Sequence, residues 1–228
     1  MFPSRKRHTL ESNADRAYNL IRRHIIFGQF EPGEVLSEEV LMTRFHLGRT
    51  PIREAIVRLG HEGLVTAFPR KGTQVRGIDF TDLMAIYEVR APLESQAGRL
   101  AAVRVDDTTR EASRELGGAI KKLERPTKDE GRALLKLDED VHRFVYAASR
   151  SPLLHEALDH YLDLSLRIIY ILLPTRPRLN DALSESLIRH GLLLAAIEDG
   201  DADRAADAIS SGLRDFQQAL SGVVSSLA

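Results

Sequence analysis

The segment "RTPIREAIVRLGHEGL", residues 49–64, carries the clearest structural signal of the N-terminal part of the chain. Its apolar residues follow the i, i+3, i+4, i+7 spacing of a helix with one buried face. They are Ile52, Ala55, Ile56 and Leu59. Arg49 and Arg53 stand one helical turn apart, so both guanidinium groups project from the same side. Either Gly48 or Thr50 can serve as the N-cap, which leaves the start of the helix open between them.

Two interpretations of this helix follow from its own residues. It is either a surface helix with ordinary charges, in which Arg58 pairs with Glu54, or a helix that lies on an anionic partner. Arginine offers a planar fork that pairs bidentately with guanine or grips phosphate. The flanking segments decide between the two interpretations.

These segments predict a winged helix-turn-helix. Residues 13–30 have helical periodicity, with Gly28 placed to stop the helix. "EPGEVL" (31–36) reads as a turn, and Ser37 can cap a short helix over 38–45. Residues 64–78 read as two short strands around a basic turn. In this fold the last helix enters the DNA major groove with its N-terminal residues at the base edges. The predicted DNA-binding residues are Arg49, Thr50, Arg53, Lys71 and Gly72.

Composition agrees with a chain of two domains. The 228 residues are 43% hydrophobic and 29% charged, which is ordinary for globular proteins. Residues 1–77 carry a net charge of +5 and residues 78–228 one of −6. A basic head on an acidic body suits a polyanion-binding module joined to something else, although uneven surface solvation gives the same imbalance. We therefore place the domains at 1–77 and 78–228.

Several classes are excluded or disfavoured by what the sequence lacks. It contains no cysteine, which rules out disulfides, thiolate nucleophiles and cysteine zinc sites. The longest apolar runs fall far short of the roughly 20 residues of a membrane span. The basic start leads into no apolar stretch and is not a secretory signal. We expect a cytoplasmic protein with no membrane partner.

Residues 78–228 read as helix after helix. Thr81 is the expected cap of a long first helix, in which Pro92 marks a kink or a break. The later helices are separated by Pro, Gly or Asp signals, and no strand pattern of useful length is present. The fold class is therefore mainly α: an N-terminal winged helix-turn-helix and a C-terminal all-α bundle of about six helices.

One constellation in the bundle could carry chemistry. Asp138 and His142 are four residues apart, on one helix face, and His190 lies on a later helix. A carboxylate and two imidazoles suit Zn²⁺, Ni²⁺, Mn²⁺ or Fe²⁺, although such a spacing is more often an ordinary surface pair. The same set also occurs in non-haem iron oxygenases, so the alternative function is a metal-dependent enzyme of the 2-His-1-carboxylate type. Its complete winged-helix head argues against that alternative, and the acidic bundle argues against a purely architectural DNA-binding protein.

The sequence resembles a known family over most of its length. "SEEVLMTRFHLGRTPIREAIVRLGHEGLVTAFPRKGTQVR" (37–76) resembles the DNA-binding domain of GntR-family bacterial transcription regulators. "LMAIYEVRAPLESQAGRLAA" (83–102), "LDEDVHRFVYAASRSPLL" (137–154) and "HGLLLAAIEDGDADRAADAI" (190–209) resemble the FCD effector domain of the FadR subfamily. The resemblance implies a homodimeric repressor that binds double-stranded operator DNA and responds to a small organic acid. Family members commonly differ from this chain at Gly48 and Glu39, so the operator sequence does not carry over.

The resemblance also implies a role for particular residues of the bundle. Asp138, His142 and His190 match positions that hold a divalent metal in the family. Arg90 matches an arginine that faces the same cavity and could bind the carboxylate of an acid, its alternative being an ion pair with Glu94 one turn on. A further histidine of the family aligns with Gly212. Three ligands leave coordination positions open to water or an acid, and they are also compatible with a weak or empty site.

Overall fold

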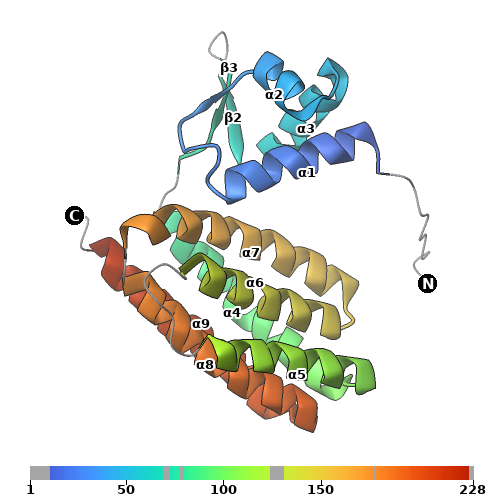
Figure 1. Cartoon of the computed structure of the whole chain (residues 1–228), viewed down its shortest axis with the longest axis vertical. Coiled ribbons are helices and arrows are strands. Elements are labelled where there is room, and N and C mark those ends of the chain that lie inside the picture. The colour runs from blue at the N-terminus through green and yellow to red at the C-terminus, as the bar shows by residue number, and fades with distance from the viewer. Residues whose placement is uncertain (1–10, 69–71, 78–79, 124–130, 177, 226–228) are drawn as a thin grey trace. The chain divides into compact units, whose positions relative to one another are not determined.

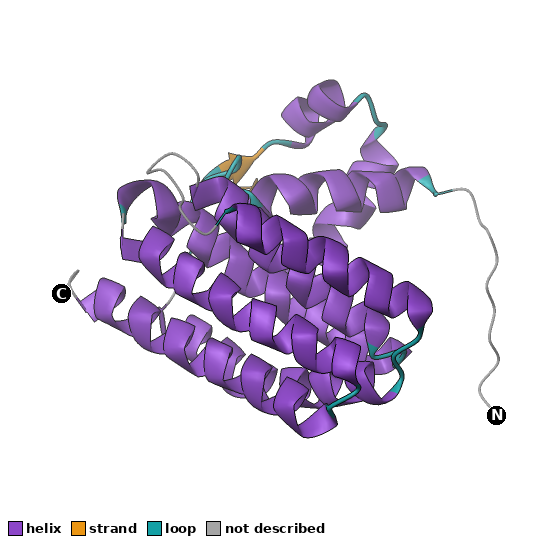
Figure 2. Ribbon diagram, turned by 60° about the horizontal axis from the view of Figure 1, so that its bottom comes forward, coloured by secondary structure: helices purple, strands orange, loops and turns teal. Residues whose placement is uncertain are grey.

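The computed structural model describes residues 11–68, 72–77, 80–123, 131–176 and 178–225 (Figure 1). The chain divides into two compact units between residues 78 and 79. Within the described residues, strands occur in the N-terminal unit alone, drawn in orange in Figure 2. The fold class expected from the sequence is confirmed: a small winged helical unit is followed by a bundle of helices.

The N-terminal unit is built on helices α1 (Asn13–Ile26), α2 (Glu38–Phe45) and α3 (Arg49–His61). Their apolar faces meet in one core, whose fully buried members include Ala17, Ile21, Ile25, Leu41, Ile52, Ala55 and Leu59. Gly28 takes φ +67°, a left-handed conformation that suits glycine and lets the chain turn away after α1. The helices occupy about the residue ranges that the sequence predicted, because each has one apolar stripe.

Two local details of α3 were open in the sequence. Gly48 is its N-cap and Thr50 lies inside the first turn, so the helix begins at Arg49. Arg58 does not pair with Glu54 as the surface-helix interpretation had it. Instead its Nη1 donates to Asp15 of α1 at 2.8 Å, and its guanidinium lies 3.9 Å from the centre of the Tyr18 ring. These contacts join the C-terminal half of α3 to α1.

A three-stranded antiparallel sheet completes this unit, in the order β1-β3-β2. The hairpin strands β2 (Val65–Phe68) and β3 (Gly72–Val75) are as expected. Strand β1 (Val35–Leu36) was missed, because two residues are too short to show alternation and "EPGEVL" reads as a turn. It pairs Val35 with Gln74 and Leu36 with Thr73. The sheet therefore ties the hairpin to the start of α2.

The C-terminal unit consists of long helices that lie side by side in both views (Figures 1 and 2). They are α4 (Phe80–Val103), α5 (Asp107–Lys122), α6 (Gly131–Ala148), α7 (Pro152–Leu172), α8 (Arg178–Asp199) and α9 (Ala202–Ser225), with a 3₁₀ turn, η1 (Leu173–Thr175), after α7. Helix α4 packs against α6, α7, α8 and α9. It runs through Pro92 without a break, and Thr81 lies inside the helix rather than capping it. None of the helices in the described ranges is long and apolar enough to cross a bilayer.

The centre of this bundle is unusually polar. Charged and polar side chains are rarely buried unless they are paired, so a buried group of them needs an explanation. Helices α4, α6, α7 and α8 contribute such residues, among them Arg90, Glu94, Asp138, His142, Ser165, Ser186 and His190. This buried polar group is the candidate site in the C-terminal unit.

Candidate metal centre and nucleic-acid interface

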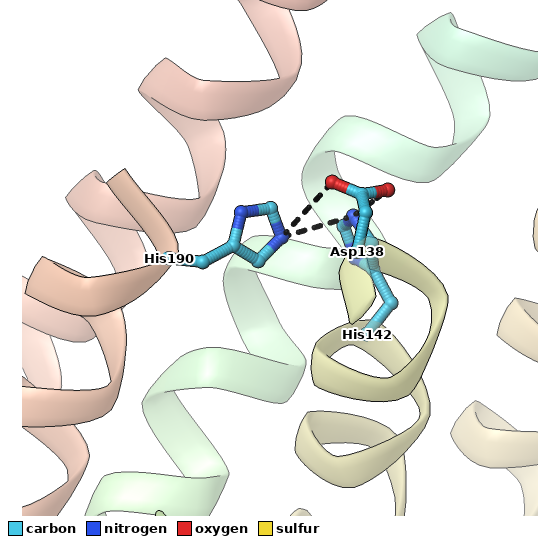
Figure 3. Close-up of side chains that lie close together, drawn as sticks. All are labelled: Asp138, His142 and His190. Atoms are coloured by element: carbon cyan, nitrogen blue, oxygen red, sulfur yellow. Dashed lines mark hydrogen bonds and ion pairs between the residues drawn. The ribbon is translucent and has the colours of Figure 1, made fainter. Parts of the chain in front are cut away.

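Three side chains converge inside the bundle (Figure 3). Helix α6 carries Asp138 and His142 one turn apart, and His190 reaches them from α8. One ligand atom from each lies within 4.8 Å of the others, and all three residues are buried. The two Nε2 atoms are 3.3 Å apart. Asp138 Oδ1 lies 3.7 Å from His190 Nε2, and its Oδ2 lies 3.8 Å from His142 Nε2. The structure thus brings together the three predicted metal ligands.

The opposite nitrogen of each ring faces an acceptor. His190 Nδ1 lies 2.7 Å from the backbone oxygen of Ser186, which can only accept, so that nitrogen carries the proton. His142 Nδ1 lies 2.9 Å from Glu94 Oε2, although without the alignment of a hydrogen bond. The contact of His190 leaves its Nε2 with a lone pair, and a proton on Nδ1 of His142 would do the same for that ring. The Ser186 hydroxyl orients the carboxylate of Asp138 by donating to Oδ1 at 3.0 Å.

Charge and burial suit a cation at this point. Burial lowers the pKa of His190 below its usual value, with the nearby Asp138 opposing that effect, so the ring is neutral near pH 7. The two Nε2 atoms and the carboxylate of Asp138 therefore converge on one point. Nitrogen and carboxylate donors in this combination bind divalent ions of the zinc, nickel and manganese class. The donor set fits a metal.

Gly212 of α9 lines the cavity beside these residues and contributes no ligand. A Cβ atom built there would meet two carbon atoms of Arg189 at an ordinary 3.7 Å, so the backbone does not demand glycine. The described part of the chain offers three protein ligands at this point. A metal held by them would keep coordination positions for water or an exogenous acid.

Arg90 forms the ion pair with Glu94 and also lines the cavity. Its Nε and Nη2 donate to Glu94 Oε1 at 2.8 and 2.6 Å, which is the ion pair one turn along the helix. It nevertheless lines the same cavity, where its Nη1 donates to the Ser165 hydroxyl at 2.6 Å. Sequence reasoning treated Glu94 only as the competitor for Arg90. The structure adds that Glu94 also faces His142.

The cavity is small, and its lining is mixed. Besides the polar groups just described, it is lined by the largely apolar side chains of Tyr87, Leu162, Leu166, Ile169, Leu213 and Phe216. Its volume is about 10 Å³, close to the minimum that holds one water molecule. It accepts an ion or a water as it stands, whereas an organic acid needs the apolar side chains to move.

The predicted DNA-binding residues lie at the N-terminal end of α3 and on the hairpin. Arg49 and Arg53 have side chains 65% and 61% exposed, and Thr50 between them is also exposed. Gly72 begins β3 with φ +85°, a conformation that favours glycine, whereas Lys71 lies outside the described residues. Glu38 of α2 was not anticipated. Both of its oxygens accept from Arg53 Nε at 2.9 Å, and Arg49 Nε lies 3.8 Å away.

The fold defines a class: a winged-helix DNA-binding head joined to a helical domain with a buried polar cavity. Residues 13–75 match the model of the gntR family of bacterial regulatory proteins, and residues 85–215 match the FCD domain. The chain belongs to the GntR family and carries an FCD effector domain.

Related proteins agree with this assignment. The chain is 29% identical over 212 residues to the HTH-type transcriptional repressor GlaR of Escherichia coli, covering 90% of this chain and 96% of that protein. It is 32% identical over 152 residues to the HTH-type transcriptional regulator YdhC of Bacillus subtilis, covering 64% and 65% of the two chains. The structure of E. coli McbR/YncC shares the fold, with a TM-score of 0.77 at 21% identity over 96% of this chain and all of that one.

These comparisons fix the general function. The protein is a transcription regulator, and regulators of its family bind operator DNA and take a small-molecule effector in the FCD domain. They give no support to the alternative of a metal-dependent enzyme. The two histidines and the carboxylate therefore belong to a regulatory domain.

Proposed function

We propose that this regulator is a homodimeric repressor whose affinity for its operator is set by a small organic acid bound beside a divalent metal in the C-terminal unit. The observation that carries the proposal is the convergence of Asp138, His142 and His190 in a buried cavity that Arg90 also lines. A metal and a guanidinium at one cavity form a receptor for a carboxylate, because both are cationic and both bind its oxygens.

DNA is held by the N-terminal unit in this account. Arg53 and Thr50 read base edges from the start of α3, and Arg49 contacts bases or phosphate beside them. Lys71 and Gly72 at the hairpin approach the backbone or the minor groove. The ion pair between Glu38 and Arg53 opens when DNA is bound, since the guanidinium then changes partners. As a protein that acts on bacterial operators, it works in the cytoplasm.

Dimerisation is assigned to the C-terminal unit. A hollow of about 440 Å³ between α5 and α8 has an apolar floor and is flanked by Ile188 and Leu192, which are 60% and 59% exposed. Gly117, Gly118 and Gly191 lie in the same hollow, and a Cβ at any of them would meet nothing within 4 Å. Small residues permit close helix approach, and a second copy would cover the exposed apolar side chains. Two-fold symmetry then requires an operator that is an inverted repeat.

In the proposed bundle site, Asp138, His142 and His190 would hold the metal, which supplies open coordination positions for an acid. Arg90 would hold the acid's other oxygens or its far end. Because the cavity is small, acid binding moves the apolar side chains that line it, and those movements favour one arrangement of the dimer over another. The change in the free energy of DNA binding is limited by the difference between the acid's binding free energies for the two arrangements of the dimer.

The experiment that tests the DNA-binding part uses an operator selected from random duplexes. Arg53→Ala is expected to lose about 1–3 kcal/mol of specific binding, the worth of one bidentate base contact, in a fluorescence-anisotropy titration. Arg99→Ala serves as a control, because it removes an exposed arginine from the C-terminal unit. Lys71→Ala should weaken binding to all sequences alike and flatten the salt dependence. Unchanged operator binding by Arg53→Ala would contradict the assignment of α3.

A further inference from the structure

The carboxylate of Glu94 contacts both halves of the proposed receptor. Its Oε1 accepts from Arg90 and, at 2.5 Å, from the Tyr146 hydroxyl. Its Oε2 lies 2.9 Å from His142 Nδ1. Glu94 itself is fully buried at 0% exposure, on α4, while Tyr146 and His142 come from α6. One side chain therefore joins the cavity arginine to a candidate metal ligand.

We propose that Glu94 is a positioning residue that holds His142 in its metal-binding tautomer and links that histidine to Arg90. The inference rests on the proposed function, because it concerns the same site. Glu94 is not a ligand in this account. It acts through His142, whose Nδ1–H it attracts so that Nε2 points its lone pair at Asp138 and His190.

The surroundings of Glu94 support this role. A buried carboxylate is costly unless it is paired. Oε1 of Glu94 accepts from the Arg90 guanidinium and from the Tyr146 hydroxyl. Its Oε2 faces the imidazole of His142. The carboxylate thus has donors on Oε1 and the ring on Oε2.

A carboxylate behind a ligating histidine has a known physical effect. It fixes which ring nitrogen is protonated, orients the ring and makes the ligating nitrogen more basic, and its loss weakens metal binding about 10- to 100-fold. The backbone oxygen of Ser186 has the corresponding role for His190, because it accepts from Nδ1 of that ring. The two histidines thus face different groups: a carboxylate for His142 and a neutral carbonyl oxygen for His190. Only the charged one is shared with the cavity arginine.

The sharing has a thermodynamic consequence. An acid that draws Arg90 away from Glu94 Oε1 changes the charge that balances the carboxylate, and hence its interaction with His142. Metal binding and acid binding are then coupled, and the coupling is reciprocal. Arg90 and Glu94 would both affect metal affinity although neither contributes a ligand atom.

The test compares Zn²⁺ affinity in the full-length protein, measured by competition with a chromophoric chelator. Glu94→Gln is expected to weaken Zn²⁺ binding about 10- to 100-fold. Glu139→Gln is the matched control: Glu139 is another buried carboxylate, on the helix of the ligands, but its partners are Arg143 and Lys136. It should change stability without changing Zn²⁺ affinity by more than about twofold. Equal affinities for Glu94→Gln and the parent would overturn the inference.

A second measurement applies even if Glu94→Gln does not fold. Nitrogen-15 NMR of the histidine rings in the metal-free parent should show His142 protonated on Nδ1 and unprotonated on Nε2. The opposite tautomer would overturn the role of Glu94. A parent protein that binds no Zn²⁺ contradicts the metal site of the proposed function instead, so the two failures are distinguishable.

Discussion

His142 Nε2 and His190 Nε2 face each other across 3.3 Å, while the Nδ1 atom of each ring faces an oxygen. With both ring protons on Nδ1, the two imidazoles would direct lone pairs toward each other and toward Asp138. Such a cluster is unfavourable unless something positive lies between its members. A divalent cation would satisfy all three groups at once, which is why we propose that the cluster binds a metal.

The contact of Glu38 with Arg53 predicts an effect on DNA selectivity. In the free protein Glu38 neutralises Arg53 and approaches Arg49. Exposed ion pairs are worth about 0.2–1 kcal/mol, so Glu38→Gln should strengthen binding to non-operator DNA by up to about fivefold at low salt. It should also steepen the salt dependence, because the arginines become available to phosphate.

Asp15→Asn is the control for that substitution, since it breaks an ion pair of similar exposure between Arg58 and α1. Anisotropy titrations on operator and scrambled duplexes at several salt concentrations give both quantities. If Glu38→Gln altered neither the non-operator affinity nor the salt slope, the pair would have no part in DNA binding.

The hollow between α5 and α8 predicts the dimer surface. Leu192→Asp places a charge among apolar side chains and should weaken self-association about tenfold or more, a cost of roughly 1.4 kcal/mol. Leu153→Asp is the control, because Leu153 is 82% exposed on α7, away from the hollow. Sedimentation equilibrium at micromolar concentration measures both. A Leu192→Asp protein that remained as dimeric as the parent would place the interface elsewhere.

His24 predicts an acid sensitivity of the DNA-binding unit. Burial lowers the pKa of His24 below its usual 6.5, against the opposing effect of the Leu20 backbone oxygen. Above pH 6.5 the ring is mostly neutral in both the folded and the unfolded chain, so it does not change the free energy of unfolding. Below that pH the unfolded chain takes up the proton first, so stability falls.

Ring-proton NMR titration of the full-length protein should therefore give a pKa for His24 below 6.5. Hydrogen exchange of amides in α1 and α3 should show protection decreasing as pH falls below that value, after correction for intrinsic rates. A pKa at or above 6.5 for His24 would contradict its burial against Phe30 and Phe45.

Much of the N-terminal unit could be predicted because its signals are local. Ser37 caps α2 and Gly28 follows α1 as expected, and the apolar stripe of α3 is buried except for the half-buried Ile56. Strand β1 could not be predicted, since two residues acquire their conformation by pairing with β3. The same holds for the contact of Arg58 with Asp15, which joins residues far apart in sequence.

In the bundle, the spacing of Asp138 and His142 predicts that they share one helix face. The same spacing does not predict that His190 lies beside them. That step needs the packing of α6 against α8, which the family resemblance supplied and periodicity did not. Glu94 was visible only as the residue one turn after Arg90. Its approach to His142 depends on the packing of α4 against α6, and that information is absent from either helix alone.

A Zn²⁺ titration of chelator-treated protein by isothermal calorimetry tests the proposed metal site. We predict one tight site per chain, lost in His142→Ala and in His190→Ala but kept in His155→Ala, whose ring is 38% exposed and paired with Asp159. Zn²⁺ at 100 times its dissociation constant should also stabilise the parent by about 2.7 kcal/mol against unfolding. Absence of stoichiometric binding, or equal binding by His190→Ala and the parent, would contradict the claim that this cluster is a metal site.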